Sequence, residues 1–173
     1  FQYGRGWESC VTMTECKDGG GWSYRPDGRT RSFEECLRML IQTVTGDGNL
    51  LFNVGPLPTG EIDPKQVEIL HQMGEWLRKY GETIYGTRGG PIPNGEWGGC
   101  TTKGDKVWVH IQKWPGDTLV IDRLKDLKVE ASRVLTGGEV KVVQTVEHTE
   151  ITMPTAQHDA LDTIIELQTV GSK

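Results

Sequence analysis

Three short segments of this sequence combine aromatic or amide side chains with tight turns, as a sugar-binding site requires. Trp7 directly precedes Glu8, and Trp22 follows a glycine-rich loop at 17–21. The face of an indole ring packs against the apolar C–H patch of a pyranose, and polar groups bind its hydroxyls. The third segment, 53–56, follows a short apolar run. A plainer interpretation makes Trp7 and Trp22 core aromatics and Glu8 a capping or salt-bridge residue, and spacing alone favours it.

The cysteines and histidines predict no metal centre. The cysteines form no CxxC pair, their spacings match no zinc module, and the histidines are scattered singly. Cys10 and Cys16 could form a disulfide in an oxidising compartment, although buried thiols are the favoured alternative. The glycines at 19–21 lack the Lys-Ser/Thr ending of a phosphate-binding loop. We therefore expect neither a metal nor a cofactor.

Composition and charge exclude several classes of protein. The chain has 173 residues, of which 35% are hydrophobic and 25% charged, and its formal net charge is −5. This balance excludes a collagen and most disordered chains. It offers no basic surplus for nucleic-acid phosphates, and no run of apolar residues is long enough to span a membrane. The length suits one ordinary domain or two small ones.

Two helices are predicted in the first half of the chain. Ser32 opens the first, and Glu35 completes a capping box three residues later. Asp63 opens the second, with Pro64 in the first turn and Gln66 in the capping-box position. The predicted apolar stripes are Phe33, Cys36, Leu37, Leu40, Ile41 and Val44 in the first helix, and Val67, Leu70, Met73, Leu77, Tyr80 and Ile84 in the second.

Strands are expected to alternate with these helices. The apolar run at 50–54 is too short for a helix and predicts a strand buried on both faces of a parallel sheet. Residues 22–24 are interpreted as the end of an earlier strand. Ligands of parallel α/β folds bind at the C-terminal ends of the strands, which is where Trp22 and 53–56 would lie. Two parallel strands cannot form a stable sheet alone, so we expect further βα units to precede Phe1 or to come from another chain.

The second half of the chain predicts an antiparallel β-sandwich. In 106–111, Val107, Val109 and Ile111 alternate with polar or aromatic residues. Further strands are expected at 118–121, 129–135, 140–146, 150–153 and 163–167, with a hairpin-type turn at 136–139. The glycine- and proline-rich stretch 86–99 is interpreted as a linker. The chain is thus predicted to be α/β over 1–88 and all-β over 89–173.

Five segments of the first half also form a recognisable series. They are Trp7-Glu8-Ser9-Cys10-Val11-Thr12-Met13, Gly21-Trp22-Ser23-Tyr24, and the stretches 48–56, 74–77 and 81–88. In order and spacing this series resembles the α-L-fucosidases of glycoside hydrolase family 29. The second half resembles, more loosely, the C-terminal sandwich of that family. The resemblance implies the last two βα units of a (β/α)8-like, TIM-type barrel at 1–88 and a C-terminal β-sandwich domain at 89–173.

The resemblance implies an enzyme that releases terminal α-L-fucose from glycans or fucosides with retention of configuration. Retention needs two carboxyl groups. The family's nucleophile is an Asp on an earlier barrel strand, so it and the acid/base are expected upstream of Phe1, and the chain alone is expected to be inactive. Fucosylated glycans lie mostly outside the cytoplasm, which implies a secreted, periplasmic or lysosomal enzyme. The expected partners are the substrate and the missing part of the barrel.

The resemblance also assigns the candidate site residues. Trp22 matches an aromatic that packs against the fucose ring and its methyl group, and Trp7 is assigned to substrate binding. Glu8 is the one candidate catalytic carboxylate on this chain, although a pocket-shaping role is favoured because it directly follows Trp7. The sequence has Trp-Ser-Tyr at 22–24 where many relatives have Trp-Gly-Tyr, and 15–20 also diverges, which leaves the preferred fucosyl linkage open.

Two alternatives remain open at this stage. The chain could be a non-catalytic carbohydrate-binding or structural sandwich with a barrel remnant, in which Trp97, Trp108 and Trp114 serve as sugar platforms. It could also be a barrel relative that has lost activity. The three tryptophans fall near the linker or a turn, positions that equally suit packing on a barrel. We therefore expect the second half to be a brace with little sugar affinity of its own.

Overall fold

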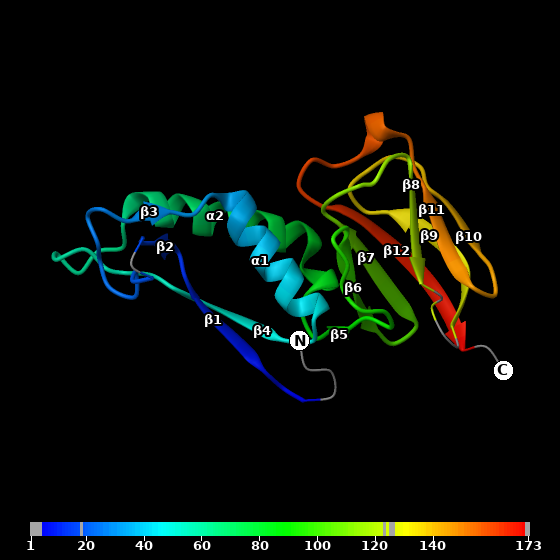
Figure 1. Ribbon diagram of the computed structural model, residues 1–173, viewed down its shortest axis with the longest axis horizontal. Coiled ribbons are helices and arrows are strands. Elements are labelled where there is room, and N and C mark those ends of the chain that lie inside the picture. The colour runs from blue at the N-terminus through cyan, green and yellow to red at the C-terminus, as the bar shows by residue number, and fades with distance from the viewer. Residues whose placement is uncertain (1–4, 18, 123, 125–126, 172–173) are drawn as a thin grey trace.

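The computed structural model describes residues 5–17, 19–122, 124 and 127–171. Strands predominate, and the described part contains two α-helices, α1 (Phe33–Thr45) and α2 (Pro64–Tyr80). The helices lie beside a pair of strands in the first half, and sheets fill the second half (Figure 1). Neither helix is long and apolar enough to cross a membrane.

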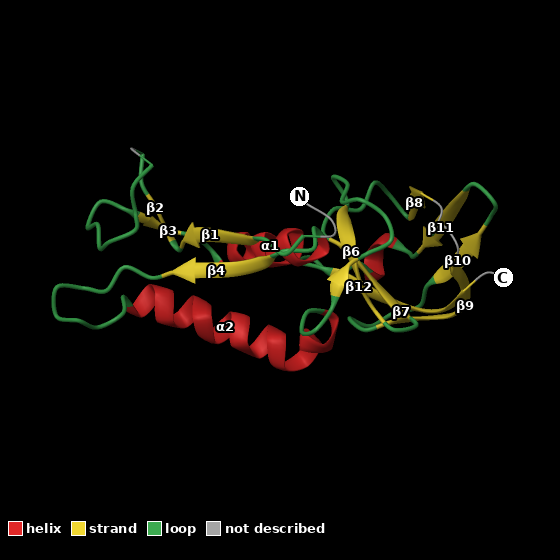
Figure 2. Ribbon diagram, turned by 90° about the horizontal axis from the view of Figure 1, so that it is seen from below, coloured by secondary structure: helices red, strands yellow, loops and turns green. Residues whose placement is uncertain are grey.

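The first half is built on two parallel strands, β1 (Glu8–Thr12) and β4 (Asn49–Asn53). They align in register from the Glu8–Asn49 pair to the Thr12–Asn53 pair. Both helices lie on the same side of this pair (Figures 1 and 2). Among the described residues β1 and β4 pair only with each other, so each has one unpaired edge. Leu51 is 44% exposed, so the described strand is not buried on both faces as predicted.

The loop between β1 and α1 contains a small hairpin rather than the predicted strand end. The hairpin joins β2 (Thr14–Glu15) to β3 (Arg29–Thr30). Residues 22–24 lie in the connection between its two strands. The parallel partner of β4 is instead β1, in the opening stretch of the chain.

The two helix starts follow the predicted caps in part. The Ser32 side chain accepts a hydrogen bond from the Glu35 amide, and the Glu35 carboxylate accepts one from the Ser32 amide. Asp63 caps α2 by accepting from the Lys65 amide at 2.9 Å. Gln66 is not part of a capping box. It is 3% exposed and donates instead to the hydroxyl of Thr14, which ties α2 to the hairpin.

The predicted stripe of α2 is only partly correct. Met73 and Trp76 are buried, whereas Val67 and Leu70 are each 36% exposed. Trp76 belongs to the buried face and was missed. The helix packs near its start through buried Gln66 and again through its middle and C-terminal turns, whereas Val67 and Leu70 lie on its exposed side.

The second half consists of two antiparallel sheets packed face to face. Their strands are β5 (Arg88–Gly89), β6 (Gly98–Lys103), β7 (Lys106–Ile111), β8 (Thr118–Asp122), β9 (Leu127–Val134), β10 (Lys141–Gln144), β11 (His148–Thr152) and β12 (Thr163–Gly171). One sheet has the order β5-β6-β7-β12-β9 and the other β10-β11-β8. Val107, Val109 and Ile111 face the core between them, as predicted, opposite Ile121 and Ile151. This arrangement is that of a β-sandwich.

Two predictions about the connections of the second half are wrong. The stretch 86–99 is not simply a linker, because β5 and the start of β6 lie in it. The turn at 136–139 does not close a hairpin, because β9 pairs with β12 while β10 pairs with β11. The sequence of β6 begins with two glycines, which are unfavourable in strands, so the sequence predicts this strand only weakly. Its place in the sheet is set by its pairing with β7.

The helical layer and the five-stranded sheet share one apolar interface. Trp108 and Ile164 point away from the sandwich core and pack with Leu37, Ile41 and Trp76 of the helices. Trp108 is 2% exposed. Each side chain of this size contributes about 1.5–3 kcal/mol when it leaves water. The sandwich is therefore joined to the helices through a continuous core.

Candidate functional site

The C-terminal ends of β1 and β4 meet beside the loop that carries Trp22. The side-chain amide of Asn53, the last residue of β4, donates a 2.9 Å hydrogen bond to the backbone oxygen of Trp22. One residue beyond β1, the Met13 amide donates to the backbone oxygen of Asn53 at 2.9 Å. Two of the three predicted segments, those at 22 and 53–56, are thus brought together at one end of the parallel pair.

The loop displays its aromatic residues to solvent. Trp22 is 56% exposed and Tyr24 is 36% exposed. A ring of this size left uncovered beside polar groups suits a flat apolar ligand surface such as a sugar ring. Trp22 thus leaves most of its ring uncovered at the end of the strand pair.

Two glycines let the loop approach the strand ends closely. Gly21 has a φ of 115°, and a Cβ there would lie 2.3 Å from the backbone oxygen of Thr14. A Cβ on Gly55 would lie 2.8 Å from the backbone of Ser23 and Tyr24. Both positions exclude a side chain, so the path of the loop past the end of β4 is narrowly defined.

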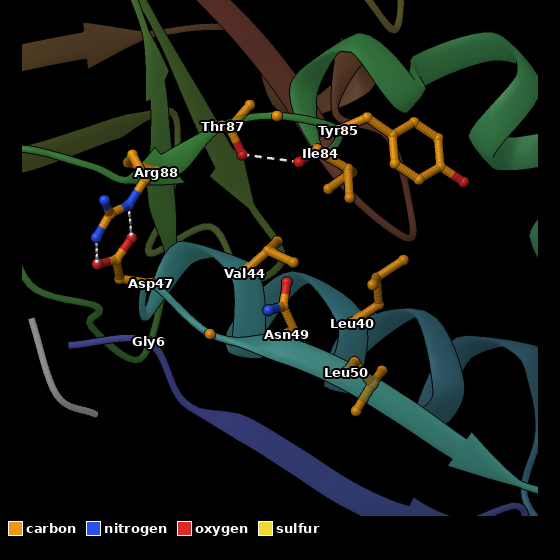
Figure 3. A pocket seen from close by; sticks show the side chains of 12 residues that line it. Gly6, Leu40, Val44, Asp47, Asn49, Leu50, Ile84, Tyr85, Thr87 and Arg88 are labelled. Carbon is orange, nitrogen blue, oxygen red and sulfur yellow. Dashed lines mark hydrogen bonds and ion pairs between the residues drawn. The ribbon is translucent and has the colours of Figure 1, made fainter.

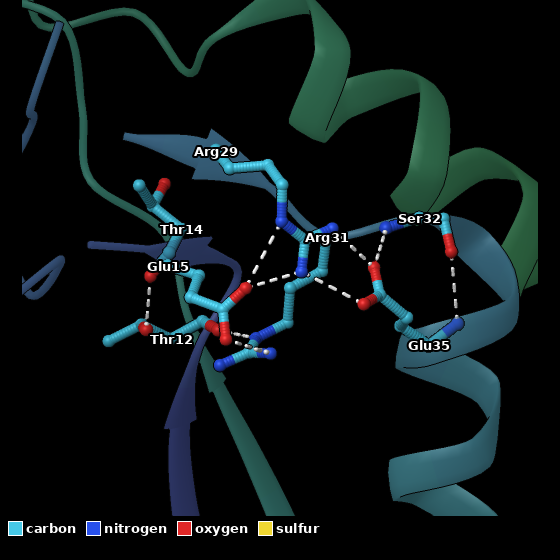
Figure 4. A network of polar contacts seen from close by, with 7 residues as sticks. All are labelled: Thr12, Thr14, Glu15, Arg29, Arg31, Ser32 and Glu35. Carbon is cyan, nitrogen blue, oxygen red and sulfur yellow. Dashed lines mark hydrogen bonds and ion pairs between the residues drawn. The ribbon is translucent and has the colours of Figure 1, made fainter. Parts of the chain in front are cut away.

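Polar contacts fix the hairpin at the base of this loop (Figure 4). Gln66 binds the Thr14 hydroxyl, and the Thr12 hydroxyl donates to the Thr14 backbone oxygen at 2.5 Å. Arg31 donates from Nε to the Thr12 backbone oxygen at 3.0 Å. These bonds link the end of β1, the hairpin and α2.

A network of opposite charges lies beside these bonds. The Arg29 guanidinium donates to the carboxylates of both Glu15 and Glu35. Its hydrogen bonds, followed by that from the Ser32 amide, lower the pKa of Glu35 to about 2. The hydrogen bond from Arg29 also lowers the pKa of Glu15. Both carboxylates therefore stay ionised at neutral pH and are already engaged.

Glu8 and Trp7 lie at the other end of the strand pair. Glu8 begins β1 and pairs with Asn49, four residues before the Thr12–Asn53 pair. At about 3.3 Å per residue this is a separation of about 13 Å along the strand. The structure therefore does not bring Glu8 together with Trp22. The exposed Glu8 carboxylate accepts a hydrogen bond from the Cys10 thiol, which raises the pKa of that thiol.

Trp7 has a packing role in this structure. Its indole N–H donates to the backbone oxygen of Gly46 at 3.1 Å. The ring lies against Gly48, where a Cβ would come within 2.4 Å of it. These contacts join the start of β1 to the turn after α1. The sequence could not distinguish the two ends of β1, because it did not show that this stretch is itself a strand.

A pocket of about 420 Å³ opens at the N-terminal end of β4 (Figure 3). Its lining includes Leu40, Val44, Asp47, Asn49 and Arg88. Asp47 is bound there by Arg88. Active sites of βα folds lie at the opposite ends of the strands, so we do not assign this pocket to catalysis.

The remaining sequence candidates are placed as follows. All four cysteines are free thiols, so Cys10 and Cys16 are not bridged. Among the described residues no three His, Cys, Asp or Glu side chains gather closely enough to hold a metal ion. Sequence reasoning missed the contributions of Arg29, Glu35 and Gln66 to the site. The two arginines at 29 and 31, followed closely by two glutamates at 34 and 35, were a signal that could have found the first two.

Comparison with known proteins gives a consistent result. The family model described as "Alpha-L-fucosidase" matches residues 2–82. The plasma alpha-L-fucosidase of Homo sapiens is 34% identical over 117 residues, which cover 63% of this chain and 24% of that protein. The chain is therefore similar to α-L-fucosidases in sequence. It spans about a quarter of the length of the curated fucosidases that it matches.

Solved fucosidase structures extend the match over the sandwich. Alpha-L-fucosidase isoenzyme 1 from Paenibacillus thiaminolyticus superimposes with a TM-score of 0.81 at 30% identity, over 95% of this chain and 40% of that one. The Thermotoga maritima α-fucosidase in complex with fucose gives a TM-score of 0.74 at 30% identity, over 95% and 40%. The likeness therefore covers both halves of the chain.

Proposed function

We propose that this chain forms the C-terminal part of a retaining α-L-fucosidase that hydrolyses terminal α-L-fucose from glycans or fucosides. Residues 1–88 supply the last two βα units of a barrel, and 89–173 form the sandwich domain. The observation that carries the proposal is the parallel pair β1–β4, whose C-terminal ends meet at the exposed Trp22. Similarity to α-L-fucosidases supports the substrate class.

The partner of this chain is the rest of the barrel. The unpaired edges of β1 and β4 offer backbone hydrogen-bonding groups to further parallel strands. Such neighbours would also cover the exposed Leu51. Every strand of a closed barrel pairs on both of its sides. Neighbouring barrel strands would therefore fill the open edge of β1 and that of β4.

The division of chemical roles follows from the site. A retaining mechanism uses two carboxyl groups about 5–5.5 Å apart, one as nucleophile and one as acid/base. Glu15 and Glu35 are occupied by Arg29, and Glu8 lies at the far end of β1. The similarity to α-L-fucosidases supports assigning the nucleophile and the acid/base to the preceding part of the enzyme. Trp22 contributes a wall against the apolar face and methyl group of fucose, and Glu8 has no catalytic role.

Activity of the isolated chain tests this division. The purified 173-residue chain should not hydrolyse an aryl α-L-fucoside, whereas the enzyme that contains it should, with the fucose released first as the α anomer. The matched variant is Glu8→Gln, which should leave kcat within about twofold because the carboxylate is remote from Trp22. Turnover by the isolated chain, or a large loss of kcat in Glu8→Gln, would reject the proposal.

Sugar binding by the sandwich is a second candidate function, supported by one groove. It has a volume of about 470 Å³ and is lined by Trp97, Trp114 and Pro115, with Lys113 and Glu96 at its rim. Trp114 is held by a hydrogen bond to Thr163 and stacks on His158. Trp108 is buried and is no sugar platform. Titration of this chain with fucosylated oligosaccharides, followed by tryptophan fluorescence, tests the candidate. A Trp97→Ala variant should abolish any response.

The proposed substrate also suggests where the enzyme acts. Among the relatives are a plasma alpha-L-fucosidase of Homo sapiens and a tissue alpha-L-fucosidase of Mus musculus. We propose an extracytoplasmic location for the enzyme: secreted, periplasmic or lysosomal. Fractionation of the source cells with an antibody against this chain tests it, and signal in the cytoplasmic fraction alone would reject it.

A further inference from the structure

We propose that Arg29 is a positioning residue for fucose binding, because its guanidinium clamps the base of the Trp22 loop onto the first turn of α1. The Trp22 loop is defined here as residues 16–28, between β2 and β3. The inference rests on the proposed function, since it assigns Arg29 the task of holding the aromatic wall of that same site.

The geometry of the clamp is two-sided (Figure 4). Toward the helix, Arg29 Nη1 and Nη2 donate to the two oxygens of Glu35 at 2.8 and 2.9 Å. Toward the hairpin, Arg29 Nε donates to Glu15 Oε2 at 3.1 Å. One planar cation thus joins the two strands of the hairpin to each other and to α1.

Both carboxylates are themselves fixed. Glu35 accepts a 2.8 Å hydrogen bond from the Ser32 amide, so its position is set by the capping box of α1. The second oxygen of Glu15 lies 3.5 Å from Nη1 of Arg31. Arg31 in turn is bonded to the backbone oxygen of Thr12 at the end of β1. The clamp therefore connects to the end of the parallel pair and to the start of the helix.

The Trp22 loop depends on such an anchor. The hairpin that closes it pairs only Thr14–Glu15 with Arg29–Thr30. Backbone hydrogen bonds inside the described part of the loop include local ones, from Gly19 to Cys16 and from Gly28 to Arg25. Closing a loop and holding an exposed ring in one place both cost conformational entropy. An anchor at the base lowers that cost before the ligand arrives.

Arginine suits this place better than lysine. Its planar fork offers parallel donors to one carboxylate and further donors to a second, whereas an ammonium is a single point of charge. An isolated exposed ion pair contributes little to stability. A network that includes a bidentate arginine–carboxylate pair contributes more, and Arg29 forms such a network with Glu35 and Glu15. Arg29→Lys should therefore retain part of the effect, and Arg29→Met should lose it.

The kinetic test uses the enzyme that contains this chain, with an aryl α-L-fucoside as substrate. We expect Arg29→Met to raise KM about fivefold and to leave kcat within about twofold. The substitution loosens the loop that binds fucose through Trp22, but it does not alter the carboxyl groups that react. Arg29→Lys should lie between Arg29→Met and the wild type. The matched control is Arg38→Met, which removes an exposed α1 arginine whose partner among the described residues is Glu34, on the same helix. A KM for Arg29→Met equal to that of Arg38→Met would overturn the inference.

Hydrogen exchange separates the clamp from the proposed function. In Arg29→Met, amides of 19–28 should exchange faster than in the wild type, while those of β4 should not change. Trp22→Ala in the same enzyme tests the site: unchanged fucose affinity would remove the proposed function and the role of Arg29 with it. If Trp22→Ala weakens binding but Arg29→Met alters neither KM nor exchange, the inference alone fails.

Discussion

Arg88 holds the carboxylate of Asp47 with two hydrogen bonds, from Nε at 2.7 Å and from Nη2 at 2.5 Å (Figure 3). The amide of Gly89 donates to the same carboxylate at 2.8 Å. Asp47 has a φ of 67°, the one positive φ at a non-glycine residue in the described part. The turn after α1 is thereby fixed to the first strand of the five-stranded sheet.

Removing this link should loosen the contact between the two halves of the chain. Arg88→Met removes the cation that donates two hydrogen bonds to the Asp47 carboxylate, whose side chain is 7% exposed, so Tm should fall. Arg78→Met on α2 is the matched control. Thermal unfolding followed by circular dichroism measures both, and equal Tm values would show that Arg88 contributes nothing.

A substitution in the core between the helices and the five-stranded sheet should destabilise the chain more than the loss of Arg88. Trp108 is 2% exposed, and its indole N–H donates to Glu166 at 3.0 Å. Trp108→Ala should lower the free energy of unfolding by about 3–5 kcal/mol, the usual cost of deleting a buried large aromatic. Trp97→Ala, at a partly buried position, should cost less. Urea unfolding monitored by circular dichroism gives both values, and the reverse order would contradict the described interface.

The aromatic wall should be specific to Trp22. In the intact enzyme, Trp22→Ala should weaken fucose binding by about 1–3 kcal/mol, the scale of burying one apolar side chain. Trp114→Ala should have little effect, because Trp114 lies in the sandwich. Isothermal titration with fucose measures the two affinities. Equal affinities in two folded variants would remove Trp22 from the sugar site.

The sandwich should act as a brace. Truncation of the enzyme after Arg88 would uncover Leu37, Ile41 and Trp76, which now pack against the sheet. Exposure of each costs about 1.5–3 kcal/mol, so Tm or solubility should drop sharply. Any soluble remainder should keep its fucose affinity. A truncated enzyme with unchanged Tm and no sugar binding would instead favour the sandwich as a recognition module.

The charge network predicts a dependence of stability on acid pH. Hydrogen bonds from Arg29 and then from Ser32 lower the pKa of Glu35 from its ordinary 4.5 to about 2. A lowered carboxyl pKa stabilises the folded state above about pH 4.5, and this contribution is lost as the pH falls toward 2. Glu15, Arg29 and Arg31 face this group. The stability difference between the wild type and Glu35→Gln should therefore be constant above pH 5 and shrink below 4.5.

Urea unfolding at several pH values measures this difference. Glu34→Gln, which removes a neighbouring carboxylate paired with Arg38, is the control. A difference for Glu35→Gln that stayed constant down to pH 3 would mean that the hydrogen bonds with Arg29 and Ser32 do not favour the ionised form.

Local signals made part of this fold predictable. The capping box at Ser32 and Glu35 and the alternation of Val107, Val109 and Ile111 each depend on residues a few positions apart, and both were confirmed. The role of Gln66 was not predictable, because its partner Thr14 lies 52 residues away. Such contacts depend on tertiary packing, which overrides local preference.

The candidate site shows the same limit. The sequence predicted a strand end at 22–24 and a strand just before 53–56. The structure places 22–24 in a loop instead, but it still brings the two segments together. The sequence could not show that Glu8 begins a strand while Trp22 lies beyond its end. The position of a residue in the sequence does not show at which end of a strand it lies. For that, the first and last residues of the strand must be known.

The unpaired edges of β1 and β4 have a consequence for anyone who prepares this chain by itself. Parallel strands with open edges can pair with any other extended segment, including the same strands of another copy. Exposed Leu51 on β4 adds an apolar surface beside one such edge. Produced by itself, the chain should self-associate as its concentration rises, and a lysine introduced at 51 should suppress that association.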